Sequence, residues 1–238
     1  MSENRIQDSN EMIFKNSEYW NKHFQERSTE IFLASQSSRR KWILESWGLK
    51  FHTIEPQFNE DSFLENLTSI NKKDIYWEVK TTQHKDLIHE ICSNLAIQKA
   101  LLAWEILKQE QKNFIVISAD TFVYYNQYFF TKPTTEEEAF QMLSFLSGKT
   151  HTVLTSHCIL NKEKKIITKE VMSLVTFRKL SPLEIKTYLS KNQFTDKAGG
   201  YGIQEEGAIL IDSIVGDYLN IIGFSLSAIR FLLSEMDT

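Results

Sequence analysis

Glycine is concentrated in one late stretch of the chain, and this stretch most restricts how the chain can fold. Six of the eight glycines lie between Gly199 and Gly223. The run DKAGGYGIQ, from Asp196 to Gln204, places three of them within four residues. Glycine adopts positive φ angles and allows a ligand to approach the backbone closely. The run therefore predicts a special turn, either at a binding site or simply between a helix and a strand.

The other residues have the composition of an ordinary globular protein. Hydrophobic residues make up 42% and charged residues 24% of the 238 positions, which disfavours disordered and fibrous classes. A net charge of −4 argues against a protein that coats nucleic acid or an anionic membrane. The two cysteines lie far apart, the first residues are polar, and no apolar stretch is long enough to cross a bilayer. We therefore expect a cytoplasmic protein with no nucleic-acid or membrane partner.

Apolar patterns predict an α/β fold with a mixed, partly antiparallel sheet. A capping box of Thr134 and Glu137 begins one helix, and Ser181 with Glu184 begins another. Strands are expected at Glu30–Ala34, at Phe114–Ser118, in an aromatic pair over 122–130, and in a hairpin of His151–Leu160 with Ile166–Phe177. Helices are expected at Arg39–Trp47, over most of Lys72–Leu107, at 134–146, at 181–189 and from Phe224.

The loop SQSSRR, Ser35 to Arg40, follows the first strand and opens the first of these helices. Hydroxyls, free backbone N–H groups and two guanidiniums at a helix N-terminus are the parts of an anion site. Two adjacent arginines there are electrostatically awkward unless an anion lies opposite. A solvated basic turn remains the alternative.

Two acidic positions are candidates for a metal or a water. Asp120 is expected at the carboxyl end of an apolar strand, where ligands gather in open α/β sheets. Glu60, within Asn59-Glu60-Asp61, offers a second hard oxygen donor for Mg²⁺. The alternatives are a turn aspartate and a solvent-facing acidic triplet. Lys99 and Lys132 are either phosphate ligands or ordinary surface lysines.

The segment SGKT, Ser147 to Thr150, is not a P-loop. Leu143 stands where the first glycine of that motif is required, and a strand is expected to follow instead of a helix.

Taken in order, these segments resemble the Maf family of nucleoside triphosphate pyrophosphatases. The resemblance covers about Ile31 to Leu233 and rests on seven ordered motifs. These are LASQSSRR (33–40), Asn59-Glu60, Lys99-Ala100, Ala119-Asp120-Thr121 with Val123, Lys132-Pro133, LSG with His151, Val153 and Thr155, and DKAGGYGIQ with Gly216, Asn220 and Gly223.

The resemblance implies an elongated, two-lobed α/β fold with a mixed sheet and a central cleft, and hydrolysis between the α and β phosphates of a nucleoside triphosphate. In this reading Ser35, Arg39, Arg40, Lys99 and Lys132 hold the phosphates, while Glu60 and Asp120 engage a divalent metal, Mg²⁺ or else Mn²⁺. Asp120 also activates the attacking water. Thr121 and Gln204, together with Arg39, match positions associated with base choice. The form DKAGGYGIQ is similar to the branch that acts on dTTP and UTP, and homodimers are common in the family.

Three departures from the family pattern and two unexplained segments accompany the resemblance. Ser38 replaces the proline of the first motif, Asn59 replaces the first acid of an acidic pair, and Thr131 precedes Lys132 where the family usually carries a small apolar residue or glycine. Residues 1–28 form an N-terminal extension before a single domain at 29–238, and a longer stretch follows Asp61. Two alternatives stay open, namely a catalytically weak nucleotide-binding regulator of cell division, and the same chemistry on 7-methyl-GTP.

Overall fold

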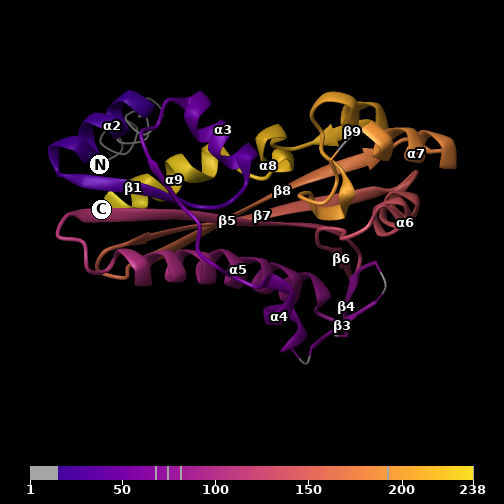
Figure 1. Ribbon diagram of the computed structural model, residues 1–238, viewed down its shortest axis with the longest axis horizontal. Helices are drawn as coiled ribbons and strands as arrows, with labels where there is room; N and C mark the ends of the chain where they lie inside the picture. Colours follow the sequence, from indigo (N-terminus) through magenta and orange to yellow (C-terminus); the bar gives the residue numbers. More distant parts are fainter. Residues whose placement is uncertain (1–15, 68, 74, 81, 192, 238) are drawn as a thin grey trace, which may run out of the picture.

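One long sheet with helices on both faces forms the protein (Figure 1). The computed structural model describes residues 16–237 except 68, 74, 81 and 192. Among these residues, nine strands run in the order β3-β4-β6-β5-β7-β8-β9, with β1 paired to β5 and β2 to β1. The pairs β1/β2 and β1/β5 are parallel and the others antiparallel, which confirms the expected mixed sheet. The strands are β1 (Thr29–Ala34), β2 (His52–Ile54), β3 (Ile70–Lys72), β4 (Trp77–Val79), β5 (Asn113–Tyr125), β6 (Tyr128–Phe130), β7 (Thr150–Asn161), β8 (Ile166–Phe177) and β9 (Ile211–Val215).

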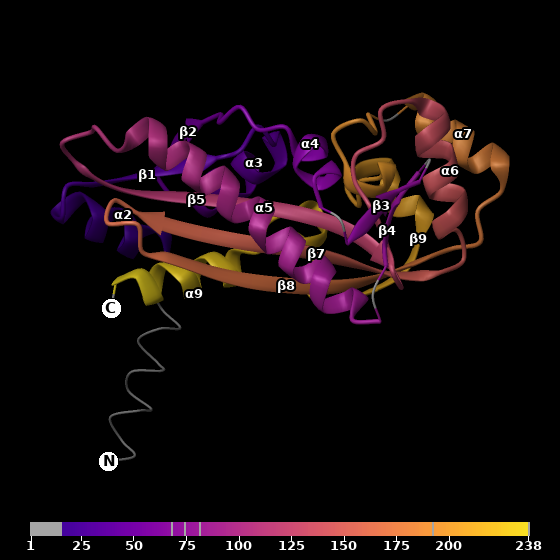
Figure 2. The ribbon, with the colours of Figure 1, turned by 90° about the horizontal axis from the view of Figure 1, so that it is seen from below.

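The helices cover the two faces of the sheet unequally. The long helix α5 lies along the strands β5, β7 and β8 on one face, as Figure 2 shows from below. The helices α8 and α9 pack on β7 and β8 from the other face, beside α2 and α3 (Figure 1). The helices are α2 (Ser17–Glu26), α3 (Ser38–Trp47), α4 (Glu60–Glu65), α5 (His84–Leu107), α6 (Glu136–Leu146), α7 (Pro182–Lys191), α8 (Tyr218–Ile222) and α9 (Leu226–Asp237). Within the described residues, none of these helices combines the length and the apolar character needed to cross a bilayer.

Strand β5 corrects the expectation that Asp120 ends a strand. The apolar run Phe114–Ser118 continues without a break to Tyr125, because β7 pairs with it from Ile115 to Tyr124. Asp120 therefore lies in the middle of a strand that is buried along most of its length. A turn at Asn126, which lies in the left-handed region at φ 54°, joins β5 to β6 and completes the expected aromatic pair of strands.

Two further expectations are wrong in detail. The described residues between 72 and 79 are not helical, since β3 pairs with β4 there and Trp77 stacks on Phe129 of β6 with ring centroids 6.3 Å apart. The N-cap of α6 is Thr135, one residue later than expected: Thr135 Oγ1 accepts from the Glu138 N–H at 3.1 Å, while the Glu138 carboxylate accepts from the Thr134 N–H at 2.6 Å. The capping box of α7 is confirmed, because the Ser181 N–H donates to Glu184 Oε2 at 2.7 Å. The hairpin of β7 and β8 is also confirmed.

Helix α2 belongs to the expected N-terminal extension, yet it is part of the core. Trp20 is fully buried and Phe24 nearly so. The Asn21 amide donates to Gly48 O at 2.8 Å, and its oxygen accepts from the Lys50 N–H at 2.7 Å. Helix α2 is thereby fastened to the end of α3. Residues 1–15 of the extension lie outside the described residues, and the boundary at residue 29 stays a prediction.

Two buried histidines are held in the neutral form. His151 Nε2 lies 2.6 Å from Tyr201 Oη, and burial lowers the pKa of His151 to about 3. His157 accepts from the Ser225 N–H at Nε2 (2.8 Å) and lies 3.1 Å from Lys169 O at Nδ1. This fixes the proton of His157 on Nδ1. Burial lowers the pKa of His157 to about 4.

We predict that His157 makes the protein lose stability on mild acidification. Its folded pKa lies below its ordinary value, so the unfolded chain binds the proton first and stability falls as the pH drops from about 6.5 towards 4. Between pH 7.5 and 5.0 this contributes about 2 kcal/mol. Urea unfolding at both pH values should show a loss smaller by that amount in His157→Gln than in the wild type. Equal losses in the two proteins would contradict the assignment.

Candidate functional site

The site lies where one edge of β5 has no neighbouring strand. Strand β1 pairs with β5 only as far as Ile117, and β6 begins to pair at Val123. Among the described residues, no strand pairs with residues 118–122 on that edge. A cavity of about 620 Å³ opens there. Successive side chains of a strand point to opposite faces, so Asp120 and Thr121 bring both faces of the sheet to one cavity.

Every predicted site residue lines this cavity. They come from the loop before α3, the first turn of α3, the start of α4, the middle of α5, β5, the segment after β6 and the glycine-rich segment, and they are Ser35, Arg39, Arg40, Glu60, Lys99, Asp120, Thr121, Lys132 and Gln204. The fold thus gathers residues that are far apart in the chain. What each does there stays a prediction.

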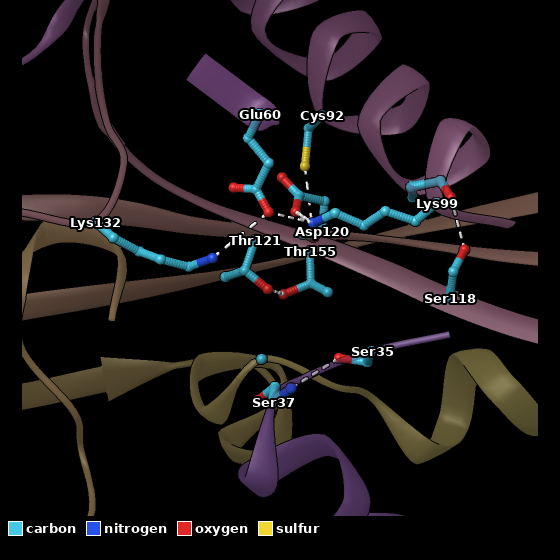
Figure 3. Close-up of polar contacts among 12 residues, drawn as sticks. Ser35, Ser37, Glu60, Cys92, Lys99, Ser118, Asp120, Thr121, Lys132 and Thr155 are labelled. Carbon is cyan, nitrogen blue, oxygen red and sulfur yellow. Dashed lines mark hydrogen bonds and ion pairs between the residues drawn. The ribbon is translucent and has the colours of Figure 1, made fainter. Parts of the chain in front are cut away.

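A lysine between two carboxylates forms the centre of the site. Lys99 of α5 makes ion pairs with Asp120 and with Glu60, the latter at 2.7 Å between Nζ and Oε1 (Figure 3). Lys132 approaches the same Glu60 oxygen at 3.5 Å. Lys99 is 9% exposed and Asp120 4%, so this pair is largely removed from water, whereas Glu60 is partly exposed and Lys132 is exposed. An ion pair in such surroundings is strong but costly, because each charge has lost its hydration.

The two carboxyls differ in basicity. Burial raises the pKa of Asp120, and the negative charge of Glu60 adds to the rise, while Lys99 opposes it. Burial also disfavours ionised Glu60, but Lys99 and Lys132 outweigh burial and lower its pKa to about 2. Burial opposes the charge of Lys99 too, yet the two carboxylates raise its pKa. Neighbouring carboxyls with diverging pKa values are typical of an acid–base site, in which Asp120 is the more basic group.

The opposite face of the cavity is built around Arg40. Its guanidinium donates from Nε to Gly223 O at 2.9 Å, from Nη2 to Thr121 Oγ1 at 3.0 Å and from Nη1 to Ser35 Oγ at 3.4 Å. None of these acceptors carries a charge. Arg40 therefore keeps a full positive charge next to the cavity.

Arg39 already has an anion within the chain. It makes an ion pair with the Asp196 carboxylate and also donates to Asp196 O at 2.8 Å. The carboxylate of Asp196, in the glycine-rich segment, thus reduces the electrostatic repulsion between the two adjacent arginines. Sequence reasoning missed this role of Asp196, although the residue opens the DKAGGYGIQ motif.

The departures Ser38 and Asn59 both lie at helix starts. Ser38 is the first residue of α3, where proline is favourable. Hydroxyls hold this turn, since Ser37 N donates to Ser35 Oγ at 3.1 Å and Ser37 caps α3. Asn59 caps α4 by accepting from the Ser62 N–H at 2.9 Å. A cap at position 59 places Glu60 at the start of α4, facing Lys99.

The glycine-rich run forms the special turn that it predicts. Gly199 and Gly200 have φ angles of 70° and 75°, in the left-handed region that favours glycine. A Cβ atom on Gly199 would lie 3.3 Å from the Val123 side chain, so the turn packs directly on β5. This packing brings Gln204 to the wall of the cavity.

Thr155 of β7 is the second residue whose role sequence reasoning missed. It is fully buried and lies directly opposite Thr121 in the β5/β7 register, with the two Oγ atoms 3.0 Å apart (Figure 3). The signal in the sequence was its place in the motif that begins at His151. Cys92 also lies near Asp120, but burial raises its thiol pKa well above the ordinary value, which leaves it unreactive.

The donors of the site suit a hard divalent ion. In the described part of the chain, no group of three or more histidine, cysteine, aspartate or glutamate side chains forms a complete metal cage. Glu60 and Asp120 supply two carboxylates that meet at Lys99. Mg²⁺ is usually held by one or two carboxylates, with waters and substrate phosphates as its other ligands. The residues present therefore fit Mg²⁺ or Mn²⁺.

Comparison with known proteins assigns the family. The Maf-like protein family model matches residues 30–236. The dTTP/UTP pyrophosphatase of Thermosipho melanesiensis is 37% identical over 86% of this chain and 96% of that protein. The dTTP/UTP pyrophosphatase of Bacillus cereus (strain G9842) is 34% identical over 87% and 96%.

Solved structures give only a faint likeness. A dITP/XTP pyrophosphatase from Mycobacterium abscessus has a TM-score of 0.32 and 13% identity, over 63% of this chain and 74% of that one. The Staphylococcus aureus Ham1 protein has a TM-score of 0.34 and 12% identity, over 87% and 98%.

We predict that neutralising the two carboxylates changes stability in opposite directions. The low pKa of Glu60 means that its ionised form stabilises the fold above about pH 4.5, a gain lost as the pH falls towards 2. Glu60→Gln should therefore cost about 2 to 3 kcal/mol at pH 7. The raised pKa of Asp120 means that its ionised form is disfavoured by the fold, so Asp120→Asn should be more stable than wild type at pH 7. Chemical denaturation of both variants tests this, and shifts of the same sign would contradict it.

Proposed function

The chain belongs to the Maf family, and from this premise we propose that it hydrolyses dTTP and UTP to the nucleoside monophosphate and pyrophosphate. The relatives named above as dTTP/UTP pyrophosphatases support the reaction. The observation that carries the proposal is the buried Asp120, raised in pKa and set beside Glu60 and Lys99 in a cavity lined with cations. A polyanion needs such cations, and water attack needs such a base.

We propose that the cationic side chains hold the triphosphate. Arg40 offers a guanidinium whose hydrogen-bond acceptors are all uncharged, and Arg39 offers one that Asp196 shares. Lys99 and Lys132 approach from the opposite face of the sheet. Ser35 lies in the loop before α3 and supplies a hydroxyl to the same anion. Positive charges fixed on both sides of the substrate stabilise the charge that develops on the leaving pyrophosphate.

Asp120 is the proposed general base. One of its oxygens is occupied by Lys99, and the carboxylate has acceptor capacity left for a water molecule. The water passes a proton to Asp120 while its oxygen bonds to the α phosphorus, and the bond from that phosphorus to the bridging oxygen breaks. Pyrophosphate leaves with the electron pair of that bond. The raised pKa of Asp120 makes it a better proton acceptor than an ordinary aspartate at neutral pH.

Glu60 and Asp120 are the proposed metal ligands. A divalent ion bound there would neutralise phosphate charge and polarise the phosphoryl oxygens. Glu60 stays ionised under all physiological conditions because its pKa is about 2. Lys99 keeps the two carboxylates together by contacting both.

The remaining family expectations are also proposals. Thr121 and Gln204 line the cavity and are proposed to contact the base, with Arg39 beside them. A cytoplasmic location and a single domain over 29–238 are proposed from the resemblance. A homodimer is proposed as well, and Ile214 and Val215 on the sheet-edge strand β9 are exposed apolar residues that a partner would cover.

We predict pyrophosphate release from dTTP and UTP in the presence of Mg²⁺, and its loss by about 10² to 10⁴-fold in Asp120→Asn. Asp212→Asn is the matched control, because Asp212 is exposed on β9. The assay should include CTP and 7-methyl-GTP. Pyrophosphate release from 7-methyl-GTP alone would show that the substrate is this nucleotide and not dTTP or UTP. Nucleotide binding without any pyrophosphate release would favour a regulatory protein.

We predict that Glu60→Gln raises the Mg²⁺ concentration needed for half-maximal activity by about tenfold or more, because a charged ligand is lost. Asp61→Asn is the matched control, since Asp61 is the neighbouring exposed carboxylate of α4. Titrating Mg²⁺ at saturating UTP gives the measurement. An unchanged midpoint in Glu60→Gln would remove Glu60 from the metal site.

A further inference from the structure

A chain of hydrogen bonds runs from a guanidinium to a carbonyl behind the cavity wall. Arg40 Nη2 lies 3.0 Å from Thr121 Oγ1, which lies 3.0 Å from Thr155 Oγ1. Thr155 Oγ1 in turn lies 3.2 Å from Asn220 O. The two threonines are direct cross-strand partners of β5 and β7, so the strand register fixes their separation.

The two ends of this chain determine its direction. A guanidinium only donates hydrogen bonds and a carbonyl only accepts them, while each hydroxyl has one proton to give. Donation from Arg40 to Thr121, then to Thr155, then to Asn220 O satisfies every group. If the Thr155 proton turned towards Thr121 instead, the positive end of its dipole would point at the guanidinium. Aligned bonds in a low-dielectric interior reinforce one another, which favours the first arrangement.

From this chain of hydrogen bonds we propose that Thr155 is a positioning residue, which holds the Thr121 proton so that the Thr121 hydroxyl can only accept a hydrogen bond from the cavity. Thr155 thereby selects a nucleobase with a ring N–H group. Thr121 lines the cavity, and its proton is committed to Thr155. Its remaining lone pair accepts a hydrogen bond but cannot return one. The inference rests on the proposed function, which places a nucleobase against Thr121.

A hydroxyl that only accepts hydrogen bonds distinguishes uracil and thymine from cytosine. Uracil and thymine carry a proton on N3, whereas N3 of cytosine is a bare acceptor. A hydroxyl that only accepts can take a hydrogen bond from N3–H of uracil or thymine. Against cytosine, its lone pair would face the lone pair of N3, which is repulsive. A site whose polar group is left unpaired rejects the wrong ligand strongly.

Two residues of the late motif of Gly216, Asn220 and Gly223 hold the two ends of this chain of hydrogen bonds. The Asn220 side chain donates to Val153 O and to Ser173 Oγ, both at 3.0 Å, and is fully buried. These bonds fasten α8 to β7 and β8, which holds Asn220 O against Thr155. Gly223 O anchors Arg40 at the other end of the chain.

The test compares kcat/KM for UTP and CTP in wild type, Thr155→Val and Thr155→Ser. Valine frees the Thr121 proton to point into the cavity, so we expect the UTP-to-CTP ratio to fall by about tenfold or more. Serine keeps the hydroxyl and should restore the wild-type ratio. In a Thr121→Val background, Thr155→Val should leave the ratio unchanged, because the two residues act through one contact.

An equal loss with both nucleotides in Thr155→Val would show a purely structural role and overturn the inference. A wild type with no preference for UTP over CTP would overturn it as well. If Thr155→Val fails to fold, Thr155→Ala takes its place in the same comparison. The ratio of UTP to CTP dissociation constants, measured by calorimetry on Asp120→Asn, tests the inference without hydrolysis. Absence of pyrophosphate release in wild type therefore removes the proposed function, while an unaltered binding ratio removes the role of Thr155.

Discussion

The interruption in pairing along β5 is the constraint on which the site depends. Strand β1 stops beside Ile117 and β6 starts beside Val123, so the edge between them is open to ligand. Because Asp120 and Thr121 point to opposite faces, the opening joins a carboxylate–lysine cluster on one face to an arginine–hydroxyl cluster on the other. The continuous ladder with β7 keeps this stretch of β5 straight and buried, which makes the platform rigid.

Lys99 joins the two carboxylates of the site into one cluster. One buried ammonium faces two carboxylates, and their pKa values diverge because Glu60 has Lys132 as a second cation while Asp120 is more deeply buried. The stability that Glu60 contributes offsets the cost of keeping Asp120 ionised.

The parts of this fold that could be predicted are local. The strand, loop and helix over 29–47, the β7–β8 hairpin and the α7 cap depend on residues close in sequence. The mid-strand place of Asp120 depends on pairing with β7, more than thirty residues away, and the three-residue strands β3 and β4 are too short to show a period. The site residues could be predicted to lie together only through the family resemblance, because their distances along the sequence do not show which of them meet in space. The partners Asp196 and Thr155 were missed because each acts on another side chain.

The two arginines at the start of α3 differ in their partners within the protein, because only Arg39 is paired with a carboxylate among the described residues. Arg40 donates to uncharged oxygens, and burial lowers the pKa of its guanidinium, although the nearby Asp120 and Glu60 oppose this effect. Arg39 is already neutralised by Asp196, whose own pKa is lowered by Lys197 and Arg39 against the effect of burial. A phosphate between them would bind Arg40 without competition and would compete with Asp196 for Arg39. Asp196, which pairs with Arg39, and Gln204 lie on the same glycine-rich segment, so one piece of backbone brings both side chains to the cavity wall.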